Sequence, residues 1–195
     1  VAGYFSKGRR LHTHRKVYRV DYGMFDERRD WAAGEMLAAF DTGWGRVGLL
    51  ICEDLWHPAT SYVLFCDRAD VIITLSASPA RGVSASGPDE SVRLGSVRDW
   101  EKLLQHQSAA FNVYSVYVNR VGVEDGTAFA GHSSVTDPFG ETVAELAMDP
   151  GLAHVHLDPS VLRRRRAALP MLRDERLEVT LKNLQRVDQS RFGIL

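Results

Sequence analysis

Cysteine, net charge and long apolar runs are all scarce in this sequence of 195 residues. Its two cysteines, Cys52 and Cys66, are too few for the disulfide framework of a small secreted domain, so we expect reduced thiols and a cytoplasmic protein. The formal net charge of -1 provides no general attraction to nucleic acid or to an anionic membrane. No apolar run reaches the length of a membrane-spanning helix. We therefore predict that the protein binds neither nucleic acid nor membrane.

The overall composition is that of a folded domain. Hydrophobic residues make up 45% of the chain and charged residues 25%, which argues against disorder and allows a sizeable core. Neither an internal repeat nor a low-complexity linker divides the sequence. We therefore treat residues 1–195 as one domain.

Strand-like and helix-like segments alternate along the chain. Between residues 46 and 122 the order is strand, helix, strand, helix, strand, which indicates a largely parallel and buried sheet of the α/β class. Segments on both sides add antiparallel strands and make the sheet mixed. The predicted strands are 11–20 (or an extended edge), 36–40, 46–51, 70–78, 112–122, a hairpin over 133–146, and 152–158. The predicted helices are 58–69, 90–111, 159–168 and 174–187, and 78–89 is a predicted loop.

Two sequence patterns suggest binding sites that their context does not support. Residues 43–48 fit the spelling GxGxxG, but they precede a strand instead of following one and opening a helix, so we interpret them as a turn. The run Arg163–Arg166 stands in a near-neutral chain and is more typical of a solvated face or a subunit contact than of a nucleic-acid site. Cys66 lies within helical spacing among apolar residues and is interpreted as a core residue.

Two histidine pairs carry the only metal-like spacing. His12 and His14 share one face of a predicted strand, as do His154 and His156. No cysteine or carboxylate cluster completes either set of ligands, so we interpret both pairs as solvated strand residues. We predict no metal ion and no cofactor.

Cys52 occupies a chemically distinctive position, at the end of the apolar strand 46–51. A side chain on a sharp turn from strand to helix projects outward while the following backbone N–H groups face the reacting atom, as in a nucleophile elbow. A helix N-terminus favours a thiolate, whereas Glu53 and Asp54 disfavour it. A nucleophilic Cys52 therefore requires a nearby cation, and an inert buried cysteine is the alternative at this point.

Several motifs supply that cation together with a family resemblance. Lys16 precedes "YGMFDERRDW", and "GRVGLLICEDLW", "LSASP" and "VNRVGVEDGTAFAGHSSVTDPFGE" follow in order. This series resembles the nitrilase superfamily of carbon–nitrogen hydrolases. The resemblance extends from about residue 11 to the C-terminal helices.

The resemblance implies an αββα sandwich with mixed sheets and a Glu–Lys–Cys triad. Cys52 matches the nucleophile, and Lys16 matches the lysine that stabilises the tetrahedral intermediate. Glu27 matches a second glutamate that positions the lysine and the substrate, and the backbone N–H of Glu53 matches an oxyanion donor. The expected reaction is hydrolysis of a non-peptide C–N bond through a thioester, with release of ammonia or an amine. The side chains of Glu53 and Asp54 are then expected to hold the elbow and its neighbouring loops.

The sequence departs from the family at the first member of the triad. The general-base glutamate belongs well before the lysine, yet residues 1–15 contain neither Asp nor Glu, and the chain opens at Val1 without an initiator Met. We therefore expect the N-terminal strands and helices of the sandwich to be absent. The chain is then a fragment, one of two chains, or a truncated and inactive relative.

The substrate prediction rests on three residues. Tyr22 and Ser78 match substrate-binding positions in the glutaminase domains of glutamine-dependent NAD synthetases, which carry the most similar motifs. Arg81 follows "SP" earlier than that pattern expects, and no synthetase domain follows. We therefore predict hydrolysis of a small amide or carbamoyl compound. The alternatives are an ammonia-supplying glutaminase and a catalytically inactive binding relative.

The C-terminal helix has an apolar stripe formed by Leu177, Leu181 and Leu184. This stripe suits either docking onto the sheet or a contact between subunits. In the second case the tail "RFGIL", with Phe192, Ile194 and Leu195, reinforces the contact. With the family pattern of packed sandwiches, this predicts a homodimer or a higher even oligomer.

Overall fold

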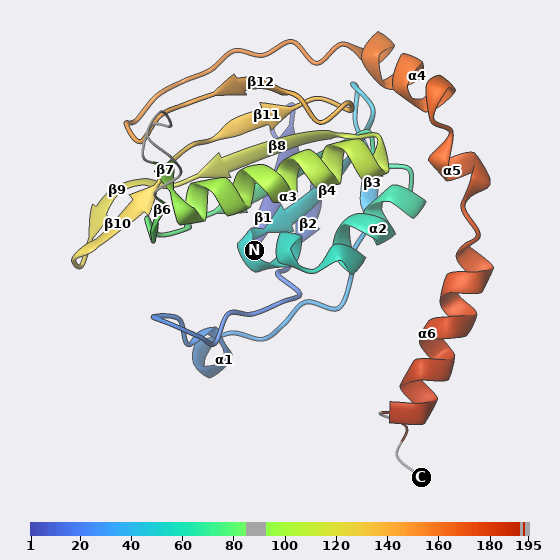
Figure 1. Ribbon diagram of the computed structural model, residues 1–195, viewed down its shortest axis with the longest axis horizontal. Coiled ribbons are helices and arrows are strands. Elements are labelled where there is room, and N and C mark those ends of the chain that lie inside the picture. Colours follow the sequence, from blue (N-terminus) through green and yellow to red (C-terminus); the bar gives the residue numbers. More distant parts are fainter. Residues whose placement is uncertain (85–92, 192, 194–195) are drawn as a thin grey trace.

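A six-stranded mixed sheet forms the centre of the computed structural model, which describes residues 1–84, 93–191 and 193 (Figure 1). Its strand order is β12-β11-β8-β5-β4-β3. The three central strands β4, β5 and β8 are parallel, and the outer strands are antiparallel to their neighbours. This confirms the α/β class and the buried parallel centre. The strands are β3 (Ala39–Asp41), β4 (Arg46–Ile51), β5 (Val71–Ser76), β8 (Tyr114–Asn119), β11 (Ser134–Thr136) and β12 (Thr142–Glu145).

Helices α2 (Pro58–Cys66) and α3 (Gly95–Phe111) cover one face of this sheet (Figure 1). Leu50, Ile72 and Tyr117 from the strands pack there against Leu64 of α2 and Trp100 of α3. The helices supply the parallel crossovers between the central strands, which explains why those strands read as continuous apolar runs.

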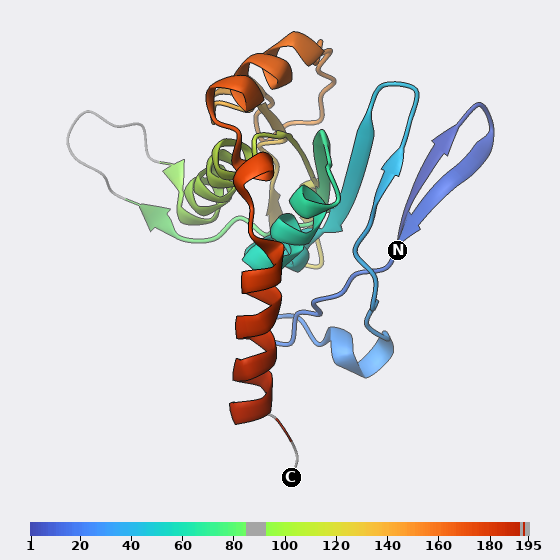
Figure 2. The same ribbon diagram turned by 90° about the vertical axis from the view of Figure 1, so that its right-hand side faces the viewer.

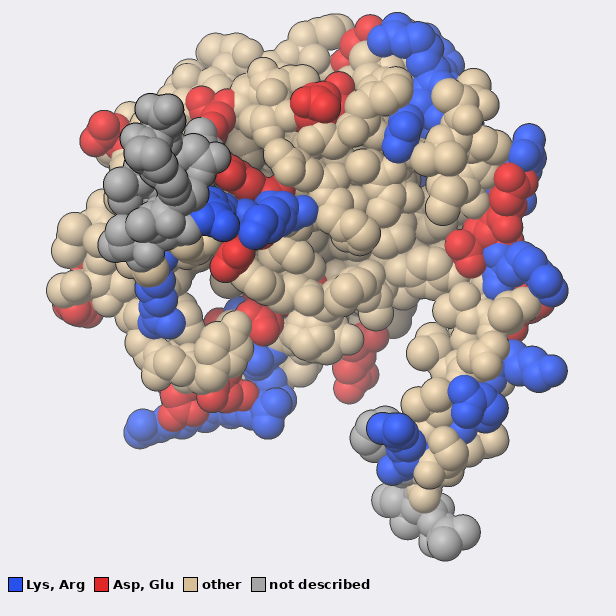
Figure 3. Space-filling view, viewed as in Figure 1, with Lys and Arg blue, Asp and Glu red and all other residues tan. Residues whose placement is uncertain are grey.

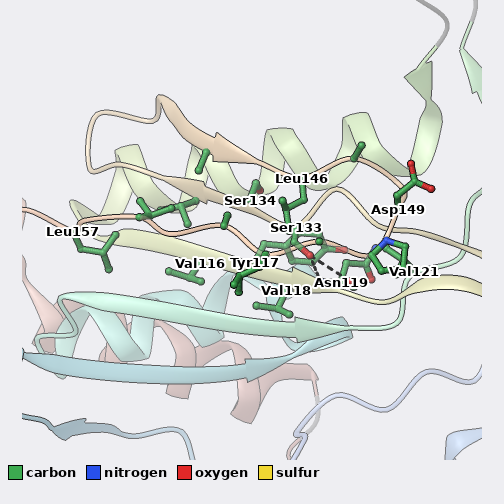
Figure 4. Close-up of a pocket in the computed structure, with 18 residues that line it drawn as sticks. Val116, Tyr117, Val118, Asn119, Val121, Ser133, Ser134, Leu146, Asp149 and Leu157 are labelled. Atoms are coloured by element: carbon green, nitrogen blue, oxygen red, sulfur yellow. Dashed lines mark hydrogen bonds between the residues drawn. The ribbon is translucent and has the colours of Figure 1, made fainter.

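The opposite face carries a second core around Val47, Leu49 and Val71. A separate hairpin, β1 (Ala2–Ser6) with β2 (Arg9–His14), lies beyond β3 and β4 (Figure 2). Farther along the sheet, this face forms the apolar pocket of Figure 4, with a volume of about 560 Å³. The segment 149–153 and strands β8, β11 and β12 contribute to its lining.

Several predicted elements differ from the structure. The strand predicted over 11–20 ends at His14. After this residue the backbone N–H groups of Val17, Tyr18 and Val20 donate to carboxylate side chains instead of to a neighbouring strand. The segment 152–158 is extended but pairs with no described strand, so that prediction was wrong. The run 112–122 divides into β8 and β9 (Val121–Glu124), and β9 forms an unpredicted hairpin with β10 (Thr127–Ala130).

The remaining elements are short or peripheral. Residues 85–89 of the predicted loop 78–89 lie outside the described residues, and residues 83–84 form one strand of a small hairpin. No helix within the described ranges is both long and apolar enough to cross a membrane. These elements are α1 (Glu27–Asp30), the 3₁₀ helix η1 (Cys52–Trp56), β6 (Val83–Ser84), β7 (Arg93–Leu94), α4 (Pro159–Ala168), α5 (Met171–Asp174) and α6 (Leu177–Arg191).

The arginine run divides into two exposed and two structural side chains. Basic side chains gather over α4 in Figure 3, where Arg163 and Arg164 are exposed. Arg166 instead pairs with Asp70 at 2.6 Å, and Arg165 binds Asn112. Arg165 and Arg166 therefore hold α4 against the central part of the fold. The predicted solvated face describes Arg163 and Arg164 but not these two residues.

A buried carboxylate holds the end of β4 in place. Asp54 is fully buried, and its Oδ2 accepts hydrogen bonds from His14 Nε2 at 2.8 Å and from the Ile51 N–H at 3.0 Å. Its Oδ1 accepts from the N–H groups of Val17 and Tyr18, both at 2.9 Å. The predicted scaffold role of Asp54 is confirmed, whereas the interpretation of His14 as a solvated strand residue was wrong.

These contacts also set the ionisation of Asp54. Burial raises the pKa of this carboxyl, but the hydrogen bonds from His14 and from the Tyr18 and Ile51 amides outweigh burial and leave the pKa lowered. A lowered pKa in the folded state stabilises the fold above the ordinary value of 3.8. That contribution is lost as the pH falls below this value.

We predict that Asp54→Asn destabilises the fold by about 3 kcal/mol, because the side-chain NH₂ of asparagine would face buried N–H groups that need an acceptor. A chain of this size should then unfold roughly 6–12 °C lower in a calorimetric scan. The variant should also lose the part of the acid-induced destabilisation that Asp54 causes below about pH 4.

Asp41→Asn is the matched control, since Asp41 forms only an exposed ion pair with Arg46 and its side chain is 82% exposed. We expect little change in stability for this variant. Equal melting temperatures for the Asp54 and Asp41 variants would contradict the assigned role of Asp54.

Candidate active site

Cys52 lies where β4 ends and η1 begins, at the carboxyl edge of the parallel strands. Its φ angle is 48°, in the left-handed region that a non-glycine residue adopts at a cost of roughly 1–3 kcal/mol. The side chain is partly buried and packs against the core beneath the helices. This is the geometry of a nucleophile elbow, in which a strained turn presents one side chain at the rim of a sheet.

Lys16 is held by Glu27 in a bidentate contact. Its Nζ donates to both carboxylate oxygens of Glu27, each at 2.7 Å. The backbone N–H of Val20, in the irregular segment after β2, also donates to the Glu27 carboxylate at 2.8 Å and so fixes its position. The side chains of Lys16 and Glu27 are only 15% and 27% exposed, so their attraction is less screened than at an open surface.

The Cys52 thiol lies among groups of both charges. Burial raises the pKa of this thiol, the Ser76 hydroxyl and the Lys16 ammonium lower it, and Glu53 and Glu27 raise it, leaving it above its ordinary value. The structure thus brings together Cys52, Lys16 and Glu27 as the sequence predicted. The thiol is neutral at rest, and forming the thiolate requires a base or a charge change on substrate binding.

Glu53 serves the local structure through its side chain. Its carboxylate accepts a hydrogen bond from Tyr22 Oη at 2.8 Å and lies 3.7 Å from His57 Nε2. Burial and this hydrogen bond raise the pKa of Tyr22 to about 12, so the phenol remains a proton donor at neutral pH. A polar pocket of about 420 Å³ lies on this side of the site, and both Tyr22 and Glu53 line it.

Arg81 approaches the same loop as Tyr22. A Cβ atom added at Gly23 would lie 3.0 Å from Arg81 Nη1, and the φ angle of Gly23 is +66°, so glycine suits both the turn and the close approach. The positive charge of Arg81 lowers the pKa of Tyr22, against the larger effects of burial and Glu53. Tyr22 and Arg81 therefore lie together beside Glu53.

Ser78 is placed differently. It is only 7% exposed, and its Oγ accepts a hydrogen bond from the indole N–H of Trp100 at 2.9 Å. Its backbone N–H donates to Asn119 Oδ1 at 2.8 Å. The side chain therefore joins the segment after β5 to α3, and the backbone N–H joins the same segment to the end of β8. Contact of Ser78 with a substrate stays a prediction.

Several groups around the thiol could not be predicted from the sequence. The His14–Asp54 pair joins residues 40 positions apart, and no spacing rule indicates such a pair. Ser76 lies within the predicted strand 70–78, and only the sheet pairing brings it beside Cys52. Across the described residues, no group of three His, Cys, Asp or Glu side chains is arranged to hold a metal ion.

The sequence and fold can be compared with those of known proteins. Residues 4–167 match the carbon–nitrogen hydrolase family. The chain is 31% identical over 145 residues to a glutamine-dependent NAD(+) synthetase from Thermotoga maritima, an alignment that covers 73% of this chain and 23% of that protein. It is 31% identical over 175 residues to an (R)-stereoselective amidase from Pseudomonas sp., covering 89% of this chain and 59% of the amidase.

A solved structure gives the same assignment. It shows a variant of the amidase from Nesterenkonia sp. AN1 in which acrylamide has added to the active-site cysteine. It matches with a TM-score of 0.64 and 26% identity over 83% of this chain and 57% of that chain. The present chain thus spans less than two thirds of each of these proteins. With a family match over residues 4–167 and agreement in fold, the chain belongs to the carbon–nitrogen hydrolases of the nitrilase superfamily.

Proposed function

We propose that the protein hydrolyses a small amide or carbamoyl compound with Cys52 as the nucleophile. The observation that carries this proposal is the thiol on a strained elbow beside the Lys16–Glu27 pair. A cysteine at the active site of the Nesterenkonia amidase supports the same chemistry.

The proposed reaction proceeds in two stages. The Cys52 thiolate attacks the carbonyl carbon, and the developing oxyanion is stabilised by the Lys16 ammonium and the Glu53 backbone N–H. The C–N bond then breaks, the leaving nitrogen takes up a proton, and ammonia or an amine departs from a thioester on Cys52. Water attacks the thioester, and the acid and the free thiol are released.

Lys16 acts electrostatically in this scheme. Its Nζ is committed to both oxygens of Glu27, an arrangement that favours an ammonium over a neutral amine. The proton of Cys52 therefore requires another acceptor. The family resemblance implies a glutamate for this step, and the chain covers only 59% of the similar amidase, so we propose that the complete protein supplies it.

Glutamine is the second candidate substrate. Tyr22 and Arg81 lie together, and a guanidinium is well suited to bind the carboxylate of an amino acid. Similarity to a glutamine-dependent NAD(+) synthetase favours the same reading. Ammonia release from glutamine, compared with release from simple amides, separates an ammonia-supplying glutaminase from a general amidase. A binding relative without activity would release none from either.

We predict that Cys52→Ala abolishes ammonia release by the complete protein, because no thioester can form. Intact-mass spectrometry should show an acyl adduct on the parent protein and none on this variant. Trypsin leaves Cys52 and Cys66 in one peptide, residues 47–68, so fragment ions are needed to place the adduct. Cys66→Ala is the control and should retain activity, and an adduct on Cys66 would refute the assignment.

We predict that Lys16→Met lowers kcat at least about 10²-fold, as expected for loss of one oxyanion-stabilising group. Removing a cation beside the thiol raises its pKa, so the rate of Cys52 alkylation by iodoacetamide should rise at higher pH than in the parent protein. Lys102→Met, at an exposed position on α3, is the control. Superimposable profiles for the parent and Lys16→Met would show that Lys16 does not act on the thiolate.

We also propose that α6 pairs with a second copy of the chain in a homodimer or larger even oligomer. Leu177, Leu181 and Leu184 are 41%, 50% and 61% exposed, so the stripe does not dock onto the sheet, and Figure 2 shows α6 extending from the body. A hydrogen bond from Tyr62 Oη to Glu175 at 2.7 Å anchors the approach to this helix. Phe192, Ile194 and Leu195 lie outside the described residues.

Leu181→Asp should therefore reduce the mass measured by light scattering at micromolar concentration, because a carboxylate disfavours an apolar contact. Lys182→Asp introduces the same group on another side of the helix and should leave the mass unchanged. A monomeric parent protein would contradict the proposal. The cytoplasm remains the proposed location.

A further inference from the structure

Three hydroxyl groups in the central sheet are buried without a hydrogen-bond partner of standard geometry. They are Thr74 Oγ1 and Ser76 Oγ on β5 and Tyr117 Oη on β8. A buried hydroxyl that loses water and gains no partner costs about 1–3 kcal/mol, so native proteins rarely keep one without a purpose. Three such groups on two neighbouring strands require an explanation.

The sheet register places one of them directly beside Cys52. Strands β4 and β5 are parallel, and their pairing continues to Ile51 opposite Leu75. The next residues along the two strands are Cys52 and Ser76. Thr74 lies two residues earlier, opposite Leu50, and so lies farther from the thiol. Ser76 is therefore the hydroxyl that the strand pairing brings to the nucleophile.

Tyr117 lies on the neighbouring strand β8, where it pairs with Thr74, and is held in a fixed position. Its ring stacks on Trp100 with a centroid separation of 4.6 Å, and the residue is only 2% exposed. Burial raises the pKa of Tyr117, as does the charge of Cys52, whereas the Ser76 hydroxyl and, to a smaller extent, the Ser78 hydroxyl lower it. The phenol thus keeps its proton and can only act as a donor toward a negative charge. Ser76 lies close enough to influence both Cys52 and Tyr117.

The charged groups that face the thiol stabilise a thiolate only in part, so further hydrogen-bond donors would favour its formation. Lys16 contributes the positive charge, whereas Glu27 from α1 and Glu53 from η1 oppose a thiolate. The neutral phenols of Tyr22 and Tyr117 also lie close enough to Cys52 to respond to its charge. Lys16 is itself shared with Glu27, so its charge is partly compensated.

We propose that Ser76 is a positioning residue that donates a hydrogen bond to the Cys52 thiolate and is oriented by a hydrogen bond from the Tyr117 hydroxyl. No proton is transferred in this arrangement. The Ser76 O–H donates to Cys52 Sγ, and the Tyr117 O–H donates to Ser76 Oγ. Hydrogen bonds in such a series strengthen one another and are stronger when the acceptor is charged. The Ser76 hydroxyl lacks a hydrogen bond of standard geometry at rest because a neutral thiol is a weak acceptor, and it gains a strong one when the thiolate forms. This inference rests on the proposed role of Cys52.

The test is the pH dependence of Cys52 alkylation by iodoacetamide, which needs no turnover. Ser76→Ala should move the midpoint of the profile upward by about one pH unit, as expected for loss of one hydrogen bond to a charged group. Tyr117→Phe should move it in the same direction by less. Ser76→Thr retains the hydroxyl and should restore the parent midpoint.

Thr74→Val is the matched control, because it removes an unpaired hydroxyl from the same strand at a greater distance from the thiol. A parent-like midpoint for Ser76→Ala, or an equal shift for Thr74→Val, would overturn the proposal. If Lys16→Met shifts the profile while Ser76→Ala does not, the role of Ser76 fails and the proposed nucleophile stands. If neither variant shifts it, the assignment of the site fails as well.

Discussion

The buried carboxylate of Asp54 is the contact on which the site depends. Its two oxygens accept four hydrogen bonds, from the end of β2, from two consecutive amides after Lys16, and from the last residue of β4. One side chain therefore fixes the thiol-bearing turn and the lysine-bearing segment relative to each other. The two segments share no strand pairing, so side-chain contacts must join them, and Tyr18 stacked on His57 and the Tyr22–Glu53 hydrogen bond add to those of Asp54.

This arrangement explains why the Cys52 thiol, which lies among carboxylates, stays protonated until the reaction begins. Burial keeps Cys52 protonated at rest, and the single nearby ammonium is shared with Glu27. In the proposed arrangement the Ser76 hydroxyl donates to the thiolate when it forms, and the Tyr117 hydroxyl orients Ser76. Both residues belong to the centre of the sheet instead of a loop. Preorganised donors on rigid strands need little reorganisation when charge develops.

The two faces of the sheet are covered unequally. Helices α2 and α3 cover one face, whereas an apolar pocket of about 560 Å³ opens on the other, where Val116, Val118 and Leu157 contribute to the lining (Figure 4). The chain also covers only 23% of the NAD(+) synthetase and 59% of the amidase. An apolar face of this kind suits a further layer of structure, as the predicted sandwich requires.

The sequence by itself determined the central strands, the helices between them and the family. These features are local: continuous apolar runs report burial, helical spacing reports a covered face, and the motifs around Lys16 and Cys52 keep their order along the chain. The elbow at Cys52 was predictable because the strand ends at that residue.

Only the tertiary structure decided which distant groups meet. Residues 152–158 have a strand-like pattern but pair with no strand in the described part of the chain, and the amides after His14 donate to carboxylates instead of to a strand. The His14–Asp54 pair and the position of Ser76 beside the thiol arise from chain packing and sheet register. Periodicity records how each residue faces the interior, but not which residue it meets there, because that contact depends on the whole fold.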